Sequence, residues 1–350
     1  MEIKSDIMTA EEGRCMQLTF DQIQTLIHGA ARVLLADGCV HLKRFTEEQE
    51  QQIQSYNEVY YIRVKTTAGI TLEMETDSSN LALSLEVNNA FRDKRFSHSI
   101  LVNGKRIGEL RGSIPDDTDS VCVEGTFALG EGFKRVQIVF PWSANSAIRS
   151  LQIDDGATVR PVNKRQNMLI FGDSITQGYD AYYPENAFSE KLVKYLDASA
   201  INKAIGGIKY YPPLAQLPDA FTPDIILVSY GGNDFHGGDK AVFEQDSLLF
   251  CQSLRDWYPD AKIIVLMPLC AGARAKNEPH WYFKELQDHL RSLSNQVENL
   301  IVIESSDFLP HDPSLFHTDG VHPLDEGHDL YFNGIKAVLE QNKYACDGGA

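Results

Sequence analysis

The sequence predicts a two-domain α/β protein, in which a β-sandwich precedes a three-layer α/β/α domain with a parallel sheet. Three observations predict this fold: the length of the chain, an apolar period of two in its first half, and short buried runs alternating with helical segments in its second half. A chain of 350 residues is long for one domain and sufficient for two. We place the sandwich at residues 1–155 and the α/β domain at residues 165–345.

The sandwich is expected because apolar and polar residues alternate between about residues 59 and 153, as is typical of half-buried antiparallel strands. Turn-forming stretches such as Asn103-Gly104 separate the alternating runs, which favours a sandwich of the jelly-roll type. The polar residues 43–56 fit either a loop or an exposed helical turn. The runs with a period of two are Tyr60, Ile62, Val64; Leu81, Leu83, Leu85, Val87; Val121, Val123, Phe127; and Val136, Ile138, Phe140.

The second domain begins after a polar linker at residues 154–167. Its apolar runs are short and are separated by segments of helical period, of which the last has an apolar face from His328 to Leu339. Buried strands that alternate with amphipathic helices predict a parallel sheet covered on both faces. Functional sites of such sheets lie at the carboxyl ends of the strands. The four runs are residues 168–171, 224–229, 263–267 and 300–303.

Composition excludes several classes of partner. The net charge of −17 disfavours nucleic acid, which requires a basic face, and anionic membranes. No apolar run approaches the roughly 20 residues of a membrane helix. The first residues lack the features of a signal peptide, and the six cysteines lack a CxxC pair, so reduced, buried thiols and a cytoplasmic location are expected. We expect neither a metal nor a cofactor, and a homo-oligomer remains open.

Three polar motifs are expected at the edge of the sheet where the parallel strands end. Ser174 stands in Gly-Asp-Ser directly after the first strand, and Asn233 stands in Gly-Gly-Asn-Asp after a later strand. Asp319 and His322 are three residues apart before the last helix, a spacing that allows a hydrogen bond between them. Each motif alone has an explanation without function. The serine could cap a helix, the asparagine could form a turn, and the Asp–His spacing could occur by chance.

In this order along residues 165–340, the motifs resemble those of the SGNH/GDSL hydrolase family. A looser match to the family's second block is Asn202 with Gly207, although the adjacent Gly206 leaves the register open by one. The resemblance implies a flavodoxin-like domain and a serine esterase with Ser174 as nucleophile, His322 as base and Asp319 orienting the base. It further implies an oxyanion hole made by the backbone N–H groups of Ser174 and Gly207 and the side-chain amide of Asn233.

The order of sandwich and hydrolase resembles the two-domain carbohydrate esterases of family 2. That resemblance implies a small-molecule or oligosaccharide ester as substrate, with acetyl groups removed from xylan or its oligosaccharides. Members of that family can use a Ser–His dyad in which a backbone carbonyl orients the histidine, so the role of Asp319 stays open. A lysophospholipase or thioesterase of the same family, and a glycan-binding protein without activity, are the alternatives.

Aromatic residues near the strand ends are candidates for the substrate pocket. Tyr179, Tyr210, Tyr211 and Trp281 could close a short acyl pocket and offer flat faces to a sugar ring, and packing in the core is the alternative for them. Asp173 and Asp234 are expected to brace their loops. Histidines 236, 311, 317 and 328 have no spacing that suits a metal and are expected at the surface.

Overall fold

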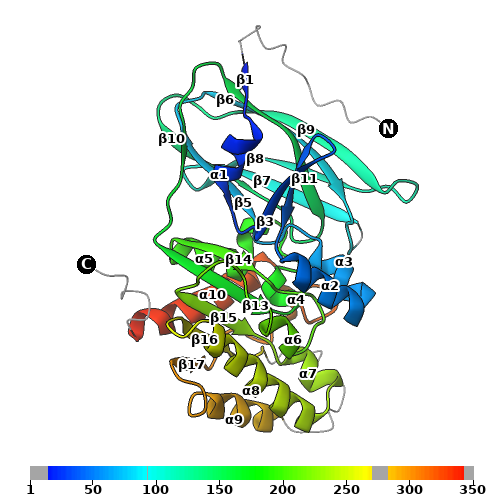
Figure 1. The fold of residues 1–350 in the computed structure, drawn as a ribbon, viewed down its shortest axis with the longest axis vertical. Helices are drawn as coiled ribbons and strands as arrows, with labels where there is room; N and C mark the ends of the chain where they lie inside the picture. The colour runs from blue at the N-terminus through cyan, green and yellow to red at the C-terminus, as the bar shows by residue number, and fades with distance from the viewer. Residues whose placement is uncertain (1–14, 93, 270–282, 343–350) are drawn as a thin grey trace.

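The computed structural model describes residues 15–92, 94–269 and 283–342. The antiparallel sheets of the first half lie above the parallel sheet of the second half in the view of Figure 1. The predicted mixed α/β fold, with a sandwich before a parallel-sheet domain, is confirmed.

The sandwich consists of two antiparallel sheets, each with six strands among the described residues. Apolar side chains from the two inner faces, such as Leu83, Ile138 and Leu151, form a single core between the sheets. One sheet has the order β3-β4-β11-β6-β9, with β1 on β11, and comprises β1 (Cys15–Gln17), β3 (Arg32–Ala36), β4 (Cys39–Lys43), β6 (Asn80–Asn88), β9 (Ser120–Ala128) and β11 (Asn145–Asp154). The other has the order β12-β5-β10-β7-β8, with β2 on β5, and comprises β2 (Ile27–His28), β5 (Thr71–Thr76), β7 (Arg95–Val102), β8 (Lys105–Ser113), β10 (Lys134–Val139) and β12 (Val159–Pro161).

Three helices interrupt the sandwich: α1 (Phe20–Leu26), α2 (Glu47–Tyr56) and α3 (Glu58–Val64). The strand expected at Tyr60, Ile62 and Val64 is therefore wrong, because this segment is α3. The Asn57 side chain accepts the N–H groups of residues 59 and 60 and so begins the helix. The segment 43–56, which the pattern left open, ends β4 and forms α2, whose Thr46 and Gln49 make a capping box.

Helices α2 and α3 pack mainly against the parallel-sheet domain. Phe45, Ile53 and Val64 are buried in the same core as the strands of that domain, and Tyr60 packs against it. Because this core includes residues from the sandwich half of the sequence, the two halves share a continuous apolar interface.

The second domain is built on five parallel strands with the order β14-β13-β15-β16-β17. This corresponds to the flavodoxin-like order 2-1-3-4-5. The strands are β13 (Gln166–Gly172), β14 (Ala198–Asn202), β15 (Ile225–Ser229), β16 (Lys262–Leu266) and β17 (Leu300–Ile303). The helices are α4 (Ser174–Gln177), η1 (Pro184–Asn186), α5 (Phe188–Tyr195), α6 (Pro212–Ala215), α7 (Gly232–Gly237), α8 (Lys240–Trp257), α9 (Phe283–Leu293), η3 (Pro313–Leu315) and α10 (Asp325–Gln341).

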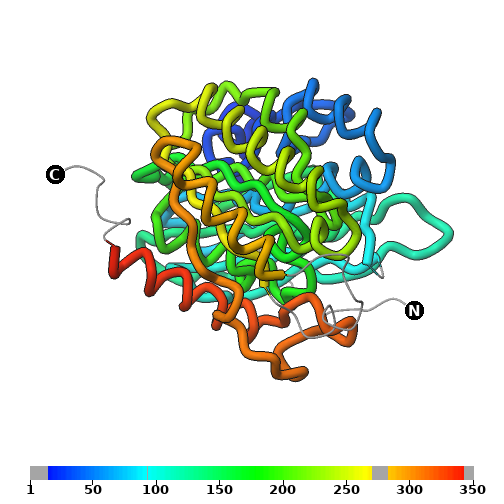
Figure 2. Tube along the Cα trace, turned by 90° about the horizontal axis from the view of Figure 1, so that it is seen from below, coloured from blue at the N-terminus to red at the C-terminus, as the bar shows by residue number. Residues whose placement is uncertain are grey.

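Successive residues of each parallel strand enter two different cores. Leu169 and Phe171 of β13 pack with α8 and α9, whereas Met168 and Ile170 pack with α5 and α10. Figure 2 shows α10 along one side of the sheet and α8 along the other. Both faces are covered, which explains why the strands read as continuous apolar runs.

No helix in the described ranges combines the length and the hydropathy of a membrane span. The described cysteines are unpaired, and the expectation of buried thiols holds for Cys39 and Cys251 but is wrong for Cys15 and Cys122, which are exposed.

Candidate active site

Ser174 lies at the carboxyl end of β13, where the strand turns directly into α4. The Asp173 side chain accepts the N–H of Ile175 and so caps this short helix. Gly172 allows the tight turn, because a Cβ at this position would come within 2.5 Å of the Thr176 side chain. Ser174 is only 4% exposed, and the helix N-terminus directs backbone N–H groups toward its surroundings.

Ser174, His322 and Asp319 form a continuous chain of hydrogen bonds. The distance from Ser174 Oγ to His322 Nε2 is 2.8 Å, and the distance from His322 Nδ1 to Asp319 Oδ2 is 2.7 Å. In the neutral tautomer that carries its proton on Nδ1, the imidazole donates to Asp319 and can accept the proton of Ser174. The arrangement has the geometry of a triad, since the carboxylate occupies the position that a dyad gives to a carbonyl.

Asp319 also shapes the loop that carries His322. Its Oδ1 accepts the backbone N–H groups of Val321 and His322 at 2.9 and 3.1 Å. Burial opposes ionisation of Asp319, but hydrogen bonds from His322, Arg92 and these N–H groups outweigh it and hold the carboxyl pKa well below its usual range. The group is therefore a carboxylate at any pH at which the fold is expected to be stable.

Gly207 and Asn233 line the same cavity as Ser174 and His322, a space of about 410 Å³. The Gly206 N–H donates to Gln177 Oε1 at 2.8 Å, whereas no described residue accepts the Gly207 N–H. The side-chain amide of Asn233 donates one hydrogen to the Ile208 carbonyl at 3.0 Å, which fixes its orientation and leaves its second hydrogen. Of the two registers open in the sequence, the structure favours Gly207 as the oxyanion donor.

Helix α3 braces the loop that carries Gly206 and Gly207. Arg63 donates to the Gly206 carbonyl, and the Tyr60 hydroxyl donates to the Gly207 carbonyl at 3.0 Å. Behind the loop, the fully buried Arg44 donates to the carbonyls of Asn202 and Ala204 and to those at the end of α3. These contacts mean that the sandwich half of the chain positions the loop that carries Gly207, the candidate oxyanion donor.

Comparison with known families now identifies the second domain. Residues 170–330 match the model of the GDSL-like Lipase/Acylhydrolase family. These residues are similar to the GDSL-like hydrolases. The match spans every residue of the chain of hydrogen bonds described above. No curated protein matches the chain.

Several solved structures share the fold of the whole chain. The salicylyl-acyltransferase SsfX3 from a tetracycline biosynthetic pathway is 17% identical, with a TM-score of 0.76 over 95% of this chain and 98% of its own. A family two carbohydrate esterase from Cellvibrio japonicus is 16% identical, with a TM-score of 0.66 over 95% and 99%. The acetyl xylan esterase Est2A from the rumen bacterium Butyrivibrio proteoclasticus is 14% identical, with a TM-score of 0.63 over 96% and 100%.

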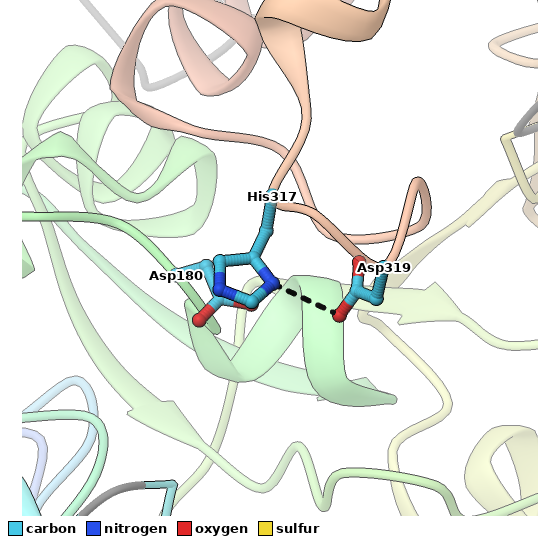
Figure 3. Close-up of side chains that lie close together, drawn as sticks. All are labelled: Asp180, His317 and Asp319. Carbon is cyan, nitrogen blue, oxygen red and sulfur yellow. Dashed lines mark ion pairs between the residues drawn. The ribbon is translucent and has the colours of Figure 1, made fainter.

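A cluster beside the GDSL-like triad was not visible in the sequence. Asp180, His317 and Asp319 lie together, with 3.4 Å between His317 Nδ1 and Asp319 Oδ2, as Figure 3 shows. Three such ligands could hold a metal ion, but the Arg92 guanidinium donates to Asp319 at 2.8 Å, contacts Asp180 and approaches His317. As the residues stand, the positive charge of this cluster is supplied by Arg92 of the β6–β7 loop.

Arg92 also approaches His322, the candidate base, at 3.5 Å from its Nδ1. The Asp180 carboxylate lies 3.6 Å from the same nitrogen, so Arg92 holds two carboxylates around the imidazole. We expect Arg92→Met to lower kcat/KM for ester hydrolysis by about tenfold, because Asp319 loses the charge-assisted hydrogen bond that helps to position it against His322. The measurement is steady-state ester hydrolysis, with Arg92→Lys expected to lie closer to wild type. An unchanged kcat/KM in a folded Arg92→Met protein would contradict this role.

The predicted substrate aromatics are not all in one place. Tyr179 lines the Ser174 cavity, with its ring centroid 5.3 Å from that of His322. Tyr210 is buried in the core against Phe243 and Phe250, and Tyr211 stacks on Tyr56. Both residues line a cavity other than that of Ser174. Trp281 lies outside the described residues. The walls that the sequence did not predict are Val59, Ile62, Arg63, Phe91 and Arg92.

Two further expectations for the loops have different outcomes. His328 is fully buried, where it accepts the Phe188 N–H and where burial lowers its pKa to about 4, so a surface position was wrong. Asp234 braces its loop by accepting the N–H of Tyr210, and burial raises its pKa to about 7. No local pattern could have revealed Arg92 or Arg63, because their partners lie more than 80 residues away.

Proposed function

We propose that this protein is a serine esterase that removes short acyl groups, chiefly acetyl, from carbohydrates such as xylan oligosaccharides. The observation that carries the proposal is the chain from Ser174 Oγ through His322 to Asp319, with distances of 2.8 and 2.7 Å. Ser174 attacks the ester carbonyl while His322 takes its proton. Gly207 and Asn233 hold the oxyanion, and His322 then returns the proton to the leaving alcohol.

The apolar walls of the cavity support a short acyl group. Val59 and Ile62 of α3 line the space beside Ser174, together with Phe91 of the β6–β7 loop and Tyr179, whose rings pack on each other. A second cavity of about 300 Å³ shares Arg92 with the first and is lined by Trp142 and Tyr182. Their rings offer the flat apolar surfaces on which a sugar ring packs, which supports a carbohydrate as the alcohol part.

A series of p-nitrophenyl esters from acetate to octanoate tests the acyl preference. We expect kcat/KM to be highest for acetate and to fall about tenfold or more by butyrate, because methylenes that the walls cannot admit cost roughly 1 kcal/mol or more. Release of acetate from acetylated xylo-oligosaccharides, followed by chromatography, tests the alcohol part. A maximum at octanoate would instead support a lysophospholipase-like or thioesterase-like enzyme, and no hydrolysis of any ester would support a glycan-binding protein.

A further inference from the structure

Two arginines line the Ser174 cavity, although the protein as a whole is strongly acidic. The chain has 49 acidic and 32 basic residues, yet the described residues that line this cavity include Arg63 and Arg92 and no aspartate or glutamate. Arginines at a cleft attract anionic substrates and bind carboxylates through paired N–H donors. The presence of two arginines in one cavity of an acidic protein therefore requires an explanation.

The two arginines differ in how their charges are balanced. Arg92 forms ion pairs with Asp180 and Asp319, so its charge is already neutralised. Arg63 makes an ion pair with no described carboxylate, and its guanidinium donates to a neutral acceptor, the Gly206 carbonyl. A guanidinium has five N–H donors, so Arg63 retains donors for a ligand.

The position of Arg63 places that free charge beside the reacting atoms. A Cβ on Gly207 would come within 2.6 Å of Arg63 Nη1, and the N–H of Gly207 is the candidate oxyanion donor. Arg63 is partly accessible on α3, and Arg44 fixes the end of this helix by donating to the Arg63 carbonyl at 2.8 Å. Arg63 thus lines the same cavity as Ser174 and Gly207, on a helix whose end is fixed by Arg44.

We propose that Arg63 binds an anionic group of the substrate, and that the preferred substrates are esters whose alcohol part carries a carboxylate, such as acylated sugar acids. This inference rests on the proposed esterase function and specifies its substrate class. The short acyl group occupies the apolar walls, so the carboxylate belongs to the alcohol part. This carboxylate takes no part in bond making or breaking. The reaction remains the hydrolysis of an ester by water to an acid and an alcohol.

A matched pair of esters tests the proposal: 3-acetoxybenzoate, which carries a carboxylate, and its neutral methyl ester. The quantity compared is the ratio of kcat/KM for the charged ester to that for the neutral ester, because oxyanion stabilisation and intrinsic reactivity cancel between proteins. In Arg63→Met we expect this ratio to fall about tenfold or more relative to wild type, as expected for loss of a charge-assisted hydrogen bond. Arg63→Gln, which keeps a donor for Gly206, should show the same fall, and Arg63→Lys should retain most of the ratio.

Two controls separate this effect from general loss of charge or fold. Arg165→Met removes an arginine that is 85% exposed just before the amino end of β13, at the opposite edge of the sheet, and should leave the ratio unchanged. In wild type, added NaCl should slow hydrolysis of the charged ester more than that of the neutral one, since salt screens the attraction. An unchanged ratio in both Arg63→Met and Arg63→Gln, or equal salt effects, overturns the proposal while leaving the esterase function intact. If the wild-type protein hydrolyses neither ester, the result contradicts the proposed esterase function and, with it, the proposal for Arg63.

Discussion

Replacement of Ser174 by alanine is expected to lower kcat for ester hydrolysis by a factor on the order of 10⁴ or more, because no other hydroxyl can form the acyl-enzyme. The Ser174 Oγ is the atom that His322 contacts at 2.8 Å at the start of α4. Removing one oxygen from a side chain that is 4% exposed changes the packing little, so the fold should persist. The measurement is steady-state hydrolysis of p-nitrophenyl acetate, with circular dichroism to verify the fold.

A second buried serine provides the matched control. Ser253 on α8 donates to the Leu249 carbonyl and lies outside the Ser174 cavity, so Ser253→Ala should retain the wild-type rate. Mass spectrometry of wild type quenched during turnover should show the acyl group on the peptide that contains Ser174. A folded Ser174→Ala protein with an unchanged kcat would remove the basis of the proposed mechanism.

Replacement of His322 by alanine is expected to reduce kcat almost as much, on the order of 10⁴-fold, because the serine hydroxyl is a poor nucleophile without a base. Asp319→Ala should reduce it less, by about 100-fold, since Asp180 Oδ2 lies 3.6 Å from the same ring nitrogen and can partly hold the imidazole. The Asp180→Ala/Asp319→Ala double variant should then approach the loss seen in His322→Ala. The measurements are kcat values of all variants at one common pH.

The outcomes distinguish a triad from a dyad. Asp329→Ala serves as the control, because Asp329 pairs with Lys191 and is 54% exposed on α10. No loss in either Asp319→Ala or the double variant would show that a backbone group orients His322, and a loss in Asp319→Ala that the double variant does not exceed would exclude a contribution from Asp180. In either case His322 would retain its role as the base.

The contacts of α3 and the β6–β7 loop give the sandwich half a direct part in the site. Tyr60 and Arg63 brace the oxyanion loop, while Phe91 and Arg92 form one side of the cavity. Arg111 and Arg106 of β8 also contact the segment after α4, through the Tyr182 carbonyl and Glu185. The walls of the cavity therefore include residues outside the family motifs.

The sequence alone was sufficient to predict the layers of the fold and the residues at the carboxyl ends of the strands. Parallel strands must be buried on both faces, so their continuous apolar runs are visible without a structure, as in residues 168–171. Ser174 and Asn233 follow such runs directly, and Asp319 and His322 are neighbours in the chain. In each case the information is local, because burial and turn geometry act within a few residues.

Only the tertiary structure decided what faces these residues. The alternation of Tyr60, Ile62 and Val64 fits a strand, but the Asn57 cap and the packing of Val64 in the parallel-sheet core favour a helix. A capping residue followed by acidic Glu58 was the available signal for that helix. The positions of Arg63 and Arg92 carry no such signal, because a side chain is drawn to carboxylates or carbonyls that folding brings from distant segments. Long-range contacts, rather than local propensity, therefore determine which charged side chains line the cavity.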